Sequence, residues 1–426
     1  MLRHRFAICF AACLPLTGAG FRASAVKVDI TPETPQWLLG YNARQSIGVT
    51  NHIYLRVVAM DSGNAQFYLI STEICEFSPG LYDEVTGELQ KEMGIDPKNV
   101  WWSTTHTHAA PELGPTGIHT AFSNLAGRFT HEWDREYAAF VTKSLIDAVR
   151  SARDKLEPAR IAFGEGSAMA NINRRGKDED GRISLGLNPD GPADRQIGLI
   201  RLEKPDGSLI AVIMNYAMHG TVMSGSNLMI GGDAPGTVTA YLEQKLGGTV
   251  LYVQGAAGNM APIYSGYPTA SAGHLTEFRV LLGDKVIEAL QKLGPATDTV
   301  TMSTAAVTVN TPQKDNLTWP SELASYAGNE GGRPTVKLPA RFLRINDTVI
   351  WSLPVELFSE IAVNVRNHSP FPHTFYFGYT NGWLGYFPTA QGFEEGGYEP
   401  QTSVLTGQAE ADLNRAVIGF IQGLPR

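Results

Sequence analysis

Short apolar runs rich in β-branched residues recur along most of this chain and alternate with amphipathic helical patterns. We predict strands at residues 54–60, 67–71, 100–104, 160–163, 197–202, 209–216, 250–254, 300–309, 340–345, 348–353 and 374–378. Apolar residues recur at helical spacing over residues 137–148, 237–246, 282–293 and 409–424. Strands and helices alternating over this length predict an α/β fold, with mixed β-sheets sandwiched by helices in a single large domain.

The N-terminus has the pattern of a secretory signal peptide. Arg3 and Arg5 precede an apolar run at residues 6–16, and Ala23-Ser24-Ala25 supplies small residues before a cleavage site. We therefore predict a signal peptide at residues 1–25, a domain at residues 26–426, and a secreted or periplasmic location. No later apolar segment is long enough to span a bilayer, so we expect no transmembrane span and at most contact with a membrane surface.

Charge and cysteine content narrow the classes of function. The chain is acidic, with a formal net charge of −8 at pH 7, which disfavours binding to nucleic acid. Cys75 is the one cysteine beyond the predicted signal peptide, so no internal disulfide is expected, and we predict that it is a small buried residue. The sequence contains no repeat and no heptad array that would indicate an oligomeric state.

The segment at residues 101–111, WWSTTHTHAAP, brings two histidines to the end of a predicted strand. Residues i and i+2 of a strand point to the same face, so His106 and His108 would project side by side if the strand persists that far. Neutral imidazole is a common zinc ligand and transfers protons near neutral pH. The alternative is a pair of ordinary surface or core histidines.

Other polar residues also follow predicted strands. His219 comes after residues 209–216, Glu356 after residues 348–353, and Tyr386 after residues 374–378. Histidines with a carboxylate are the ligand set of hydrolytic zinc sites, which keep one position open for water. We expect Glu356 to open a helix at residues 357–365, and we expect long loops over the site at residues 109–133, 262–273 and 311–339.

Many motifs in their order resemble the catalytic domain of the neutral ceramidase family. They are Asp29-Ile30-Thr31-Pro32, Thr105-His106-Thr107-His108, residues 171–174 (NINR), residues 215–223 (NYAMHGTVM), Gly232-Asp233-Ala234-Pro235-Gly236, Pro354-Val355-Glu356 and residues 378–389 (GYTNGWLGYFPT). The resemblance implies a Zn²⁺ site with His106, His219, Glu356 and Tyr386 as ligands. It also implies that His108 is catalytic, as a proton shuttle or oxyanion partner. Arg174 would be catalytic and would bind the substrate's polar group, and Asn259 would also bind the substrate. The remaining histidines match no motif and are expected at the surface: His52, His119, His131, His274, His368 and His373.

Two departures from the family pattern bear on the chemistry. The segment Gly258-Asn259-Met260-Ala261-Pro262 places Ala261 where the family has a serine proposed as nucleophile. Hydroxide bound to the metal would then attack directly, since zinc lowers the pKa of bound water to about 7. The chain also ends 27 residues after Glu399, so the family's immunoglobulin-like C-terminal domain is not expected.

These features predict a secreted, zinc-dependent hydrolase that cleaves an acyl bond, most plausibly the amide of a small-molecule or lipid-like N-acyl substrate. Two alternatives remain open at this point. The same site would also suit an esterase, a lactonase, or a deacylase of N-acyl sugars or amino acids. The second alternative is a secreted binding protein with a non-catalytic metal, in which the absence of the serine would be expected.

Overall fold

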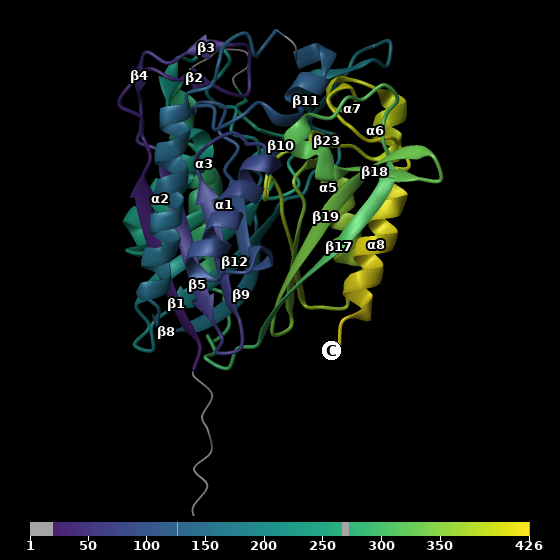
Figure 1. The fold of residues 1–426 in the computed structure, drawn as a ribbon. Helices are drawn as coiled ribbons and strands as arrows, with labels where there is room; N and C mark the ends of the chain where they lie inside the picture. Colours follow the sequence, from purple (N-terminus) through teal and green to yellow (C-terminus); the bar gives the residue numbers. More distant parts are fainter. Residues whose placement is uncertain (1–19, 126, 266–271, 426) are drawn as a thin grey trace, which may run out of the picture.

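Three larger β-sheets form the centre of the protein, and each contains one parallel strand pair. The computed structural model describes residues 20–125, 127–265 and 272–425 (Figure 1). The first sheet has the order β7 (Val100–Thr104), β6 (Gln66–Thr72), β5 (Tyr54–Asp61), β1 (Arg22–Asp29) and β8 (Glu157–Pro158). The second has the order β15 (Thr249–Gln254), β13 (Leu209–Tyr216), β12 (Gln196–Glu203) and β9 (Arg160–Ser167). The third has the order β17 (Met302–Pro312), β19 (Arg333–Ile345), β20 (Thr348–Ser352) and β22 (His373–Phe377), and β18 (Ala327–Glu330) pairs with β19.

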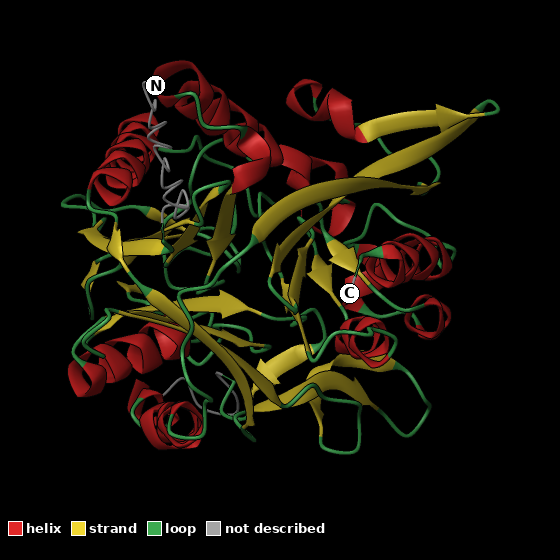
Figure 2. Cartoon of the chain, turned by 90° about the horizontal axis from the view of Figure 1, so that it is seen from below, coloured by secondary structure: helices red, strands yellow, loops and turns green. Residues whose placement is uncertain are grey.

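Helices cover the outer faces of these sheets, so that strands fill the middle of the molecule (Figure 2). Helices α1 (Pro79–Met93) and α2 (Arg135–Asp154) share a core with the first sheet. Helices α3 (Asp233–Leu246) and α4 (Lys285–Leu290) pack on the second, and α5 (Ser359–Asn367) and α8 (Ala409–Gly423) on the third. A further apolar core joins all three sheets, and its buried side chains include Met60, Trp101, Ile213, Leu251 and Phe375. Burial of this apolar surface stabilises the arrangement of the sheets.

The predicted fold class is confirmed. Each predicted strand overlaps an observed one, although β19 begins seven residues before the predicted start. The pattern at residues 237–246 lies in α3, which ends at Gly247 in the left-handed conformation (φ 75°). Smaller sheets complete the molecule: β11 (Ile183–Asn188) with β10 (Asn171–Lys177) and β16 (Met260–Pro262), and β21 (Glu356–Leu357) with β23 (Tyr386–Phe387). Among the described residues, no helix is both long and apolar enough to cross a bilayer.

Two predictions about local structure are wrong. Much of residues 311–339, predicted as a loop, belongs to β17, β18 and a long β19 whose buried and exposed residues alternate. Prolines and polar residues on the exposed face of these strands obscure the alternation of buried and exposed residues in the sequence. Glu356 does not open a helix: it lies in the short strand β21, and α5 begins at Ser359. Of the predicted loop at residues 262–273, residues 266–271 lie outside the described residues.

The predicted boundary after Ala25 falls inside a paired strand. Residues 1–19 of the predicted signal peptide lie outside the described residues, but Arg22 to Ala25 pair with Asp61 to Val58 of β5. Ala23 is buried, and the Ser24 hydroxyl donates to the Ala152 carbonyl at 2.5 Å. The paired part of β1 thus begins at Arg22, before the predicted boundary.

Candidate metal centre

The candidate site lies where strands of all three larger sheets reach their carboxyl ends. His106 and His108 follow β7, His219 follows β13, and Glu356 follows β20. Each of these strands belongs to a parallel pair, with β6, β15 and β22 respectively. The carboxyl ends of parallel strands are the usual location of ligand sites in α/β proteins. The predicted polar residues thus converge although they are far apart in sequence.

Backbone hydrogen bonds join the two histidine segments directly. The Gly220 N–H donates to the His106 carbonyl at 3.2 Å, and the His108 N–H donates to the Gly220 carbonyl at 2.9 Å. A Cβ on Gly220 would lie 2.7 Å from the His106 oxygen, so only glycine fits there. Gln254 links the same segments, because its Nε2 donates to the carbonyls of Thr105 and Met218. This contact fixes His106, His108 and His219 relative to one another.

The strand face that was predicted to carry both His106 and His108 is absent, although the two rings lie close together. β7 ends at Thr104, and His106 adopts a left-handed backbone conformation with φ 59°. The two side chains therefore do not share a strand face. The turn nevertheless brings Nε2 of His108 within 3.2 Å of Nε2 of His106.

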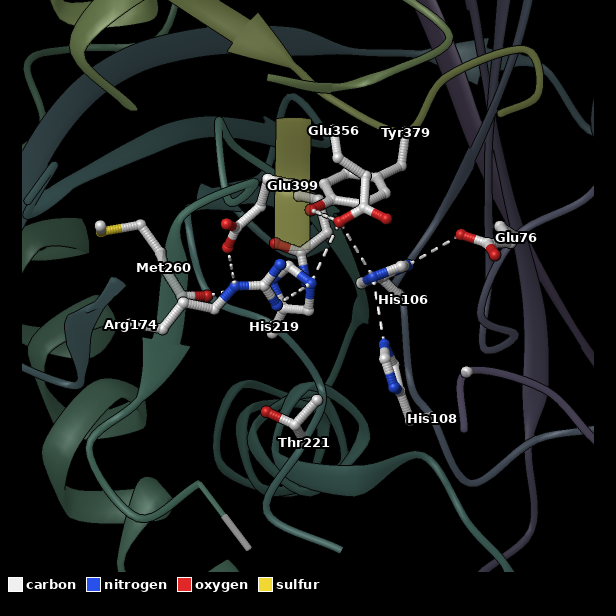
Figure 3. Close-up of polar contacts among 12 residues, drawn as sticks. Glu76, His106, His108, Arg174, His219, Thr221, Met260, Glu356, Tyr379 and Glu399 are labelled. Atoms are coloured by element: carbon white, nitrogen blue, oxygen red, sulfur yellow. Dashed lines mark hydrogen bonds and ion pairs between the residues drawn. The ribbon is translucent and has the colours of Figure 1, made fainter. Parts of the chain in front are cut away.

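Three predicted ligands surround one point (Figure 3). Oε2 of Glu356 lies 3.1 Å from Nε2 of His219 and 3.4 Å from Nε2 of His106. The ligand atoms of these three residues lie within 4.8 Å of one another, and all three side chains are buried. The cluster has the composition of a hydrolytic metal site.

The outer contacts of the two histidines fit a bound cation. Nδ1 of His106 lies 3.0 Å from the Cys75 carbonyl oxygen, and Nδ1 of His219 lies 3.0 Å from the Met260 carbonyl oxygen. A carbonyl only accepts, so each ring donates its proton from Nδ1 and turns the lone pair of Nε2 inward. Metal-binding histidines are oriented in this way by a partner at the other nitrogen. The donor set therefore fits a divalent metal such as Zn²⁺.

Glu356 is held in its ionised form by its surroundings. Burial raises the pKa of this carboxyl, but His106 and His219 lower it more, and the net pKa lies well below its usual range. Two further donors that the sequence analysis missed bind the carboxylate: the Tyr379 hydroxyl reaches Oε2 and the Trp383 Nε1 reaches Oε1, both at 2.9 Å. Both residues lie in the motif at residues 378–389, which was the available signal.

His108 lies in this centre as a neutral ring. Burial lowers its pKa well below the usual value, and the neighbouring His106 and His219 lower it further. Its Nδ1 is buried and has no hydrogen-bond partner in the part of the chain that the structure describes. Gly40, with φ 98°, approaches the ring so closely that a Cβ there would lie 2.4 Å from Cγ of His108. A buried neutral imidazole with a free nitrogen can accept or pass on a proton.

Arg174 and Tyr386 also lie beside this cluster. Arg174 Nη1 is 2.9 Å from Nε2 of His219, its Nε donates to Glu399 at 2.9 Å, and its Nη2 is buried without a partner among the described residues. Its guanidinium lies 5.3 Å from the ring centre of Tyr386. Tyr386 pairs with Glu356 between β21 and β23 and lines the same pocket as His106 and His108.

The structure gives Asn259 a different role from the predicted one. Its Nδ2 donates to Glu360 at 2.7 Å and its Oδ1 accepts from the Ser359 N–H at 3.0 Å, with the residue fully buried. These contacts fasten the start of α5 to the loop before β16, so Asn259 supports the site and does not line it. Ala261, at the position of the family serine, is buried in β16 opposite Ile172.

Of the histidines expected at the surface, His119 is buried and His131 is partly buried, with its side chain 8% exposed. His119 lies in the short helix η2 (Gly117–Ala121), bonds to Glu76 and stacks on Trp383, and His131 bonds to Glu112 and stacks on Trp37. His52 and His368 are exposed as predicted, and His274 and His373 are partly exposed. His119 lines the pocket at the metal centre, a small cavity of about 20 Å³ that also borders Glu76, Phe129, Trp383 and Tyr398.

Comparison with known proteins finds a matching family and similar sequences. The sequence profile of the family described as neutral/alkaline non-lysosomal ceramidase, N-terminal, matches residues 21–324. Similar proteins include the neutral ceramidase of Pseudomonas aeruginosa, 26% identical over 57% of this chain and 37% of that protein, and neutral ceramidase A of Dictyostelium discoideum, 27% identical over 63% of this chain and 40% of that protein. The chain thus spans about two fifths of the length of these relatives.

Solved structures share the fold. The crystal structure of neutral ceramidase from Pseudomonas aeruginosa superposes with a TM-score of 0.73 at 19% identity, covering 96% of this chain and 75% of that one. A structure titled "Ceramidase complexed with C2" gives the same TM-score at 17% identity, covering 95% of this chain and 76% of that one.

Proposed function

The chain belongs to the neutral/alkaline non-lysosomal ceramidase family, and on that premise we propose that it is a metal-dependent hydrolase that cleaves the amide bond of an N-acyl compound. The observation that carries this proposal is the buried group of His106, His219 and Glu356, in which each histidine donates from Nδ1 to a backbone carbonyl and turns Nε2 toward the carboxylate. We propose Zn²⁺ as the metal and Tyr386 as an additional ligand.

The chain's own residues account for the steps of amide hydrolysis. When bound, Zn²⁺ would supply a Lewis acid that polarises the carbonyl and makes a neighbouring water more acidic. Oxygen of that water bonds to the carbonyl carbon, the C–N bond breaks, and His108 carries the proton to the leaving amine. The free Nη2 of Arg174 would donate a hydrogen bond to a substrate oxygen. Ala261 has no nucleophile to contribute, so this reaction forms no covalent acyl-enzyme.

The experiment compares a short N-acyl amide with the ester of the same acyl group, with and without a chelator. We expect hydrolysis of the amide that depends on the metal and is lost in the His108→Ala variant. A His368→Ala variant is the control, because His368 is exposed on the far end of α5 and should retain activity. Hydrolysis of the ester alone would favour an esterase, and an inert protein with a fully loaded metal would favour a binding protein.

We also propose that the chain is exported. The basic residues and apolar run at residues 3–16 support this proposal, and the pairing of Arg22 to Ala25 with β5 favours a cleavage point before Phe21. Sequencing the N-terminus of protein recovered outside the cytoplasm tests both points. A cleaved terminus at Val26 would contradict the boundary, and full-length protein retained in the cytoplasm would contradict export.

A further inference from the structure

A carboxylate with one unused oxygen lies beside the candidate metal centre. Glu76 is about 6% exposed and lines the metal pocket. Its Oε1 accepts from Nε2 of His119 at 2.7 Å, whereas its Oε2 is buried and has no hydrogen-bond partner among the described residues. A buried carboxylate oxygen without a donor is costly, so such an atom requires an explanation.

The contacts of His119 fix the position of this carboxylate. Nδ1 of His119 donates to the Thr116 carbonyl oxygen at 2.5 Å, and this contact orients the ring so that Nε2 lies 2.7 Å from Oε1 of Glu76. Trp383, stacked on the His119 ring with centroids 4.2 Å apart, restricts the ring further. Glu76 is therefore held in place with one free oxygen.

Glu76 does not serve as the outer partner of His106. Its Oε2 lies 3.8 Å from Nδ1 of His106, which is beyond hydrogen-bond distance, and the proton on that nitrogen is already donated to the Cys75 carbonyl at 3.0 Å. Figure 3 shows the Glu76 carboxylate turned toward His106 from the side opposite His219. Glu76 thus lines the pocket within one imidazole ring of the metal centre, with Oε2 buried at its wall.

We propose that Glu76, positioned by His119, is a specificity-determining residue that accepts a hydrogen bond from a hydroxyl or amine group of the substrate close to the scissile amide. This inference rests on the proposed function and specifies its substrate class: a polar N-acyl compound with such a donor. The cavity beside it has a volume of about 20 Å³, which is enough for one compact polar group about the size of a water molecule, such as a hydroxyl. A hydrogen-bond donor of the substrate at this position would pair with Oε2 of Glu76.

The test uses three amides with one short acyl group. Their amines are ethanolamine, ethylenediamine and propylamine, so the hydroxyl or amine donor is replaced by a methyl group of similar size. We expect the wild type to prefer the two donor-bearing amides about 10–100-fold in kcat/KM, the range for hydrogen bonds to a charged group. In Glu76→Gln this preference should fall to a few-fold, while the propylamide is hydrolysed at nearly the wild-type rate and metal content is unchanged.

The matched control is Glu112→Gln. Glu112 also forms a buried pair with a histidine, His131 at 2.9 Å, but it does not line the metal pocket. It should retain the wild-type preference. A wild type without preference, or a Glu76→Gln variant that keeps it, would overturn the proposal. An equal loss on all three amides together with lost metal would also overturn it, because that result indicates a purely structural role.

A binding measurement separates this inference from the proposed function. Calorimetry on the metal-free protein measures affinity for the ethanolamide and the propylamide without turnover. We expect about tenfold tighter binding of the ethanolamide to the wild type and to Glu112→Gln, and equal binding of both amides to Glu76→Gln. If the loaded enzyme is inert but this difference is present, the proposed function fails and the subsite stands. If the enzyme is active and the difference is absent, the subsite fails alone.

Discussion

Nε2 of His219 lies 3.1 Å from Oε2 of Glu356, although the two residues follow strands of different sheets. Burial would disfavour the ionised carboxyl, but the two histidines keep its pKa well below the usual range. A cation bound at this point would contact the carboxylate and both Nε2 atoms.

Substitutions of His106 and of His108 should have different effects, the first on metal binding and the second on proton transfer. We expect His106→Ala to lose the metal, because its Nε2 faces Glu356 at 3.4 Å. His108→Ala should keep the metal and lose about 10²–10⁴-fold in turnover, the usual contribution of a positioned proton carrier. Metal content and turnover of both purified variants check this. Loss of metal only in His108→Ala would reverse the assignment.

Tyr379 should tune the affinity for the metal. Tyr379→Phe removes the hydroxyl that donates to Glu356 Oε2, and loss of such an outer contact lowers metal affinity about 10–100-fold. Tyr82→Phe is the control: its hydroxyl donates to the carbonyls of Pro97 and Val100, away from the site. Competition with a metal indicator measures both affinities. Equal affinities in the two variants would show that the Tyr379 contact does not matter for binding.

The turnover rate should depend on Gly40, because this residue lies against the ring of His108. In Gly40→Ala the new Cβ would lie 2.4 Å from Cγ of the His108 ring, so we expect at least a tenfold loss of kcat with the metal retained. Gly247→Ala is the matched control, since it has a similar positive φ of 75° but no atom within 4 Å of the new Cβ. Both variants should lose about 1 kcal/mol of unfolding free energy from the strained backbone. If both retain full turnover, the position of His108 does not limit the reaction.

Ala261 distinguishes water from serine as the nucleophile. If water attacks, Ala261→Ser should change the rate only modestly, because the buried hydroxyl adds a hydrogen bond at most. Steady-state rates on a panel of N-acyl and ester substrates, with and without chelator, provide the measurement. A wild type inert on every substrate beside an active Ala261→Ser variant would show that the chemistry needs the serine.

The sequence was sufficient for the elements but not for every contact between them. His106, His219 and Glu356 could be predicted because polar residues that follow apolar strands are recognisable, and motif order supported the choice. The local geometry could not: the left-handed turn at His106 depends on Gly220 from another sheet. Glu76 and His119 were missed for the same reason. The sequence around Glu76 and the sequence around His119 contain no pattern that predicts their contact. The two side chains meet because η2 packs beside the end of β6.

The most direct test of the central claim is the position of the metal in a crystal of the zinc-loaded protein, located by anomalous scattering at the zinc absorption edge. The account predicts one strong peak about 2.0–2.2 Å from Nε2 of His106, Nε2 of His219 and a carboxylate oxygen of Glu356. Tyr386 should lie at the same centre, and a His219→Ala crystal should lack the peak. A peak elsewhere in the molecule, or none at these residues in fully loaded protein, would contradict the account.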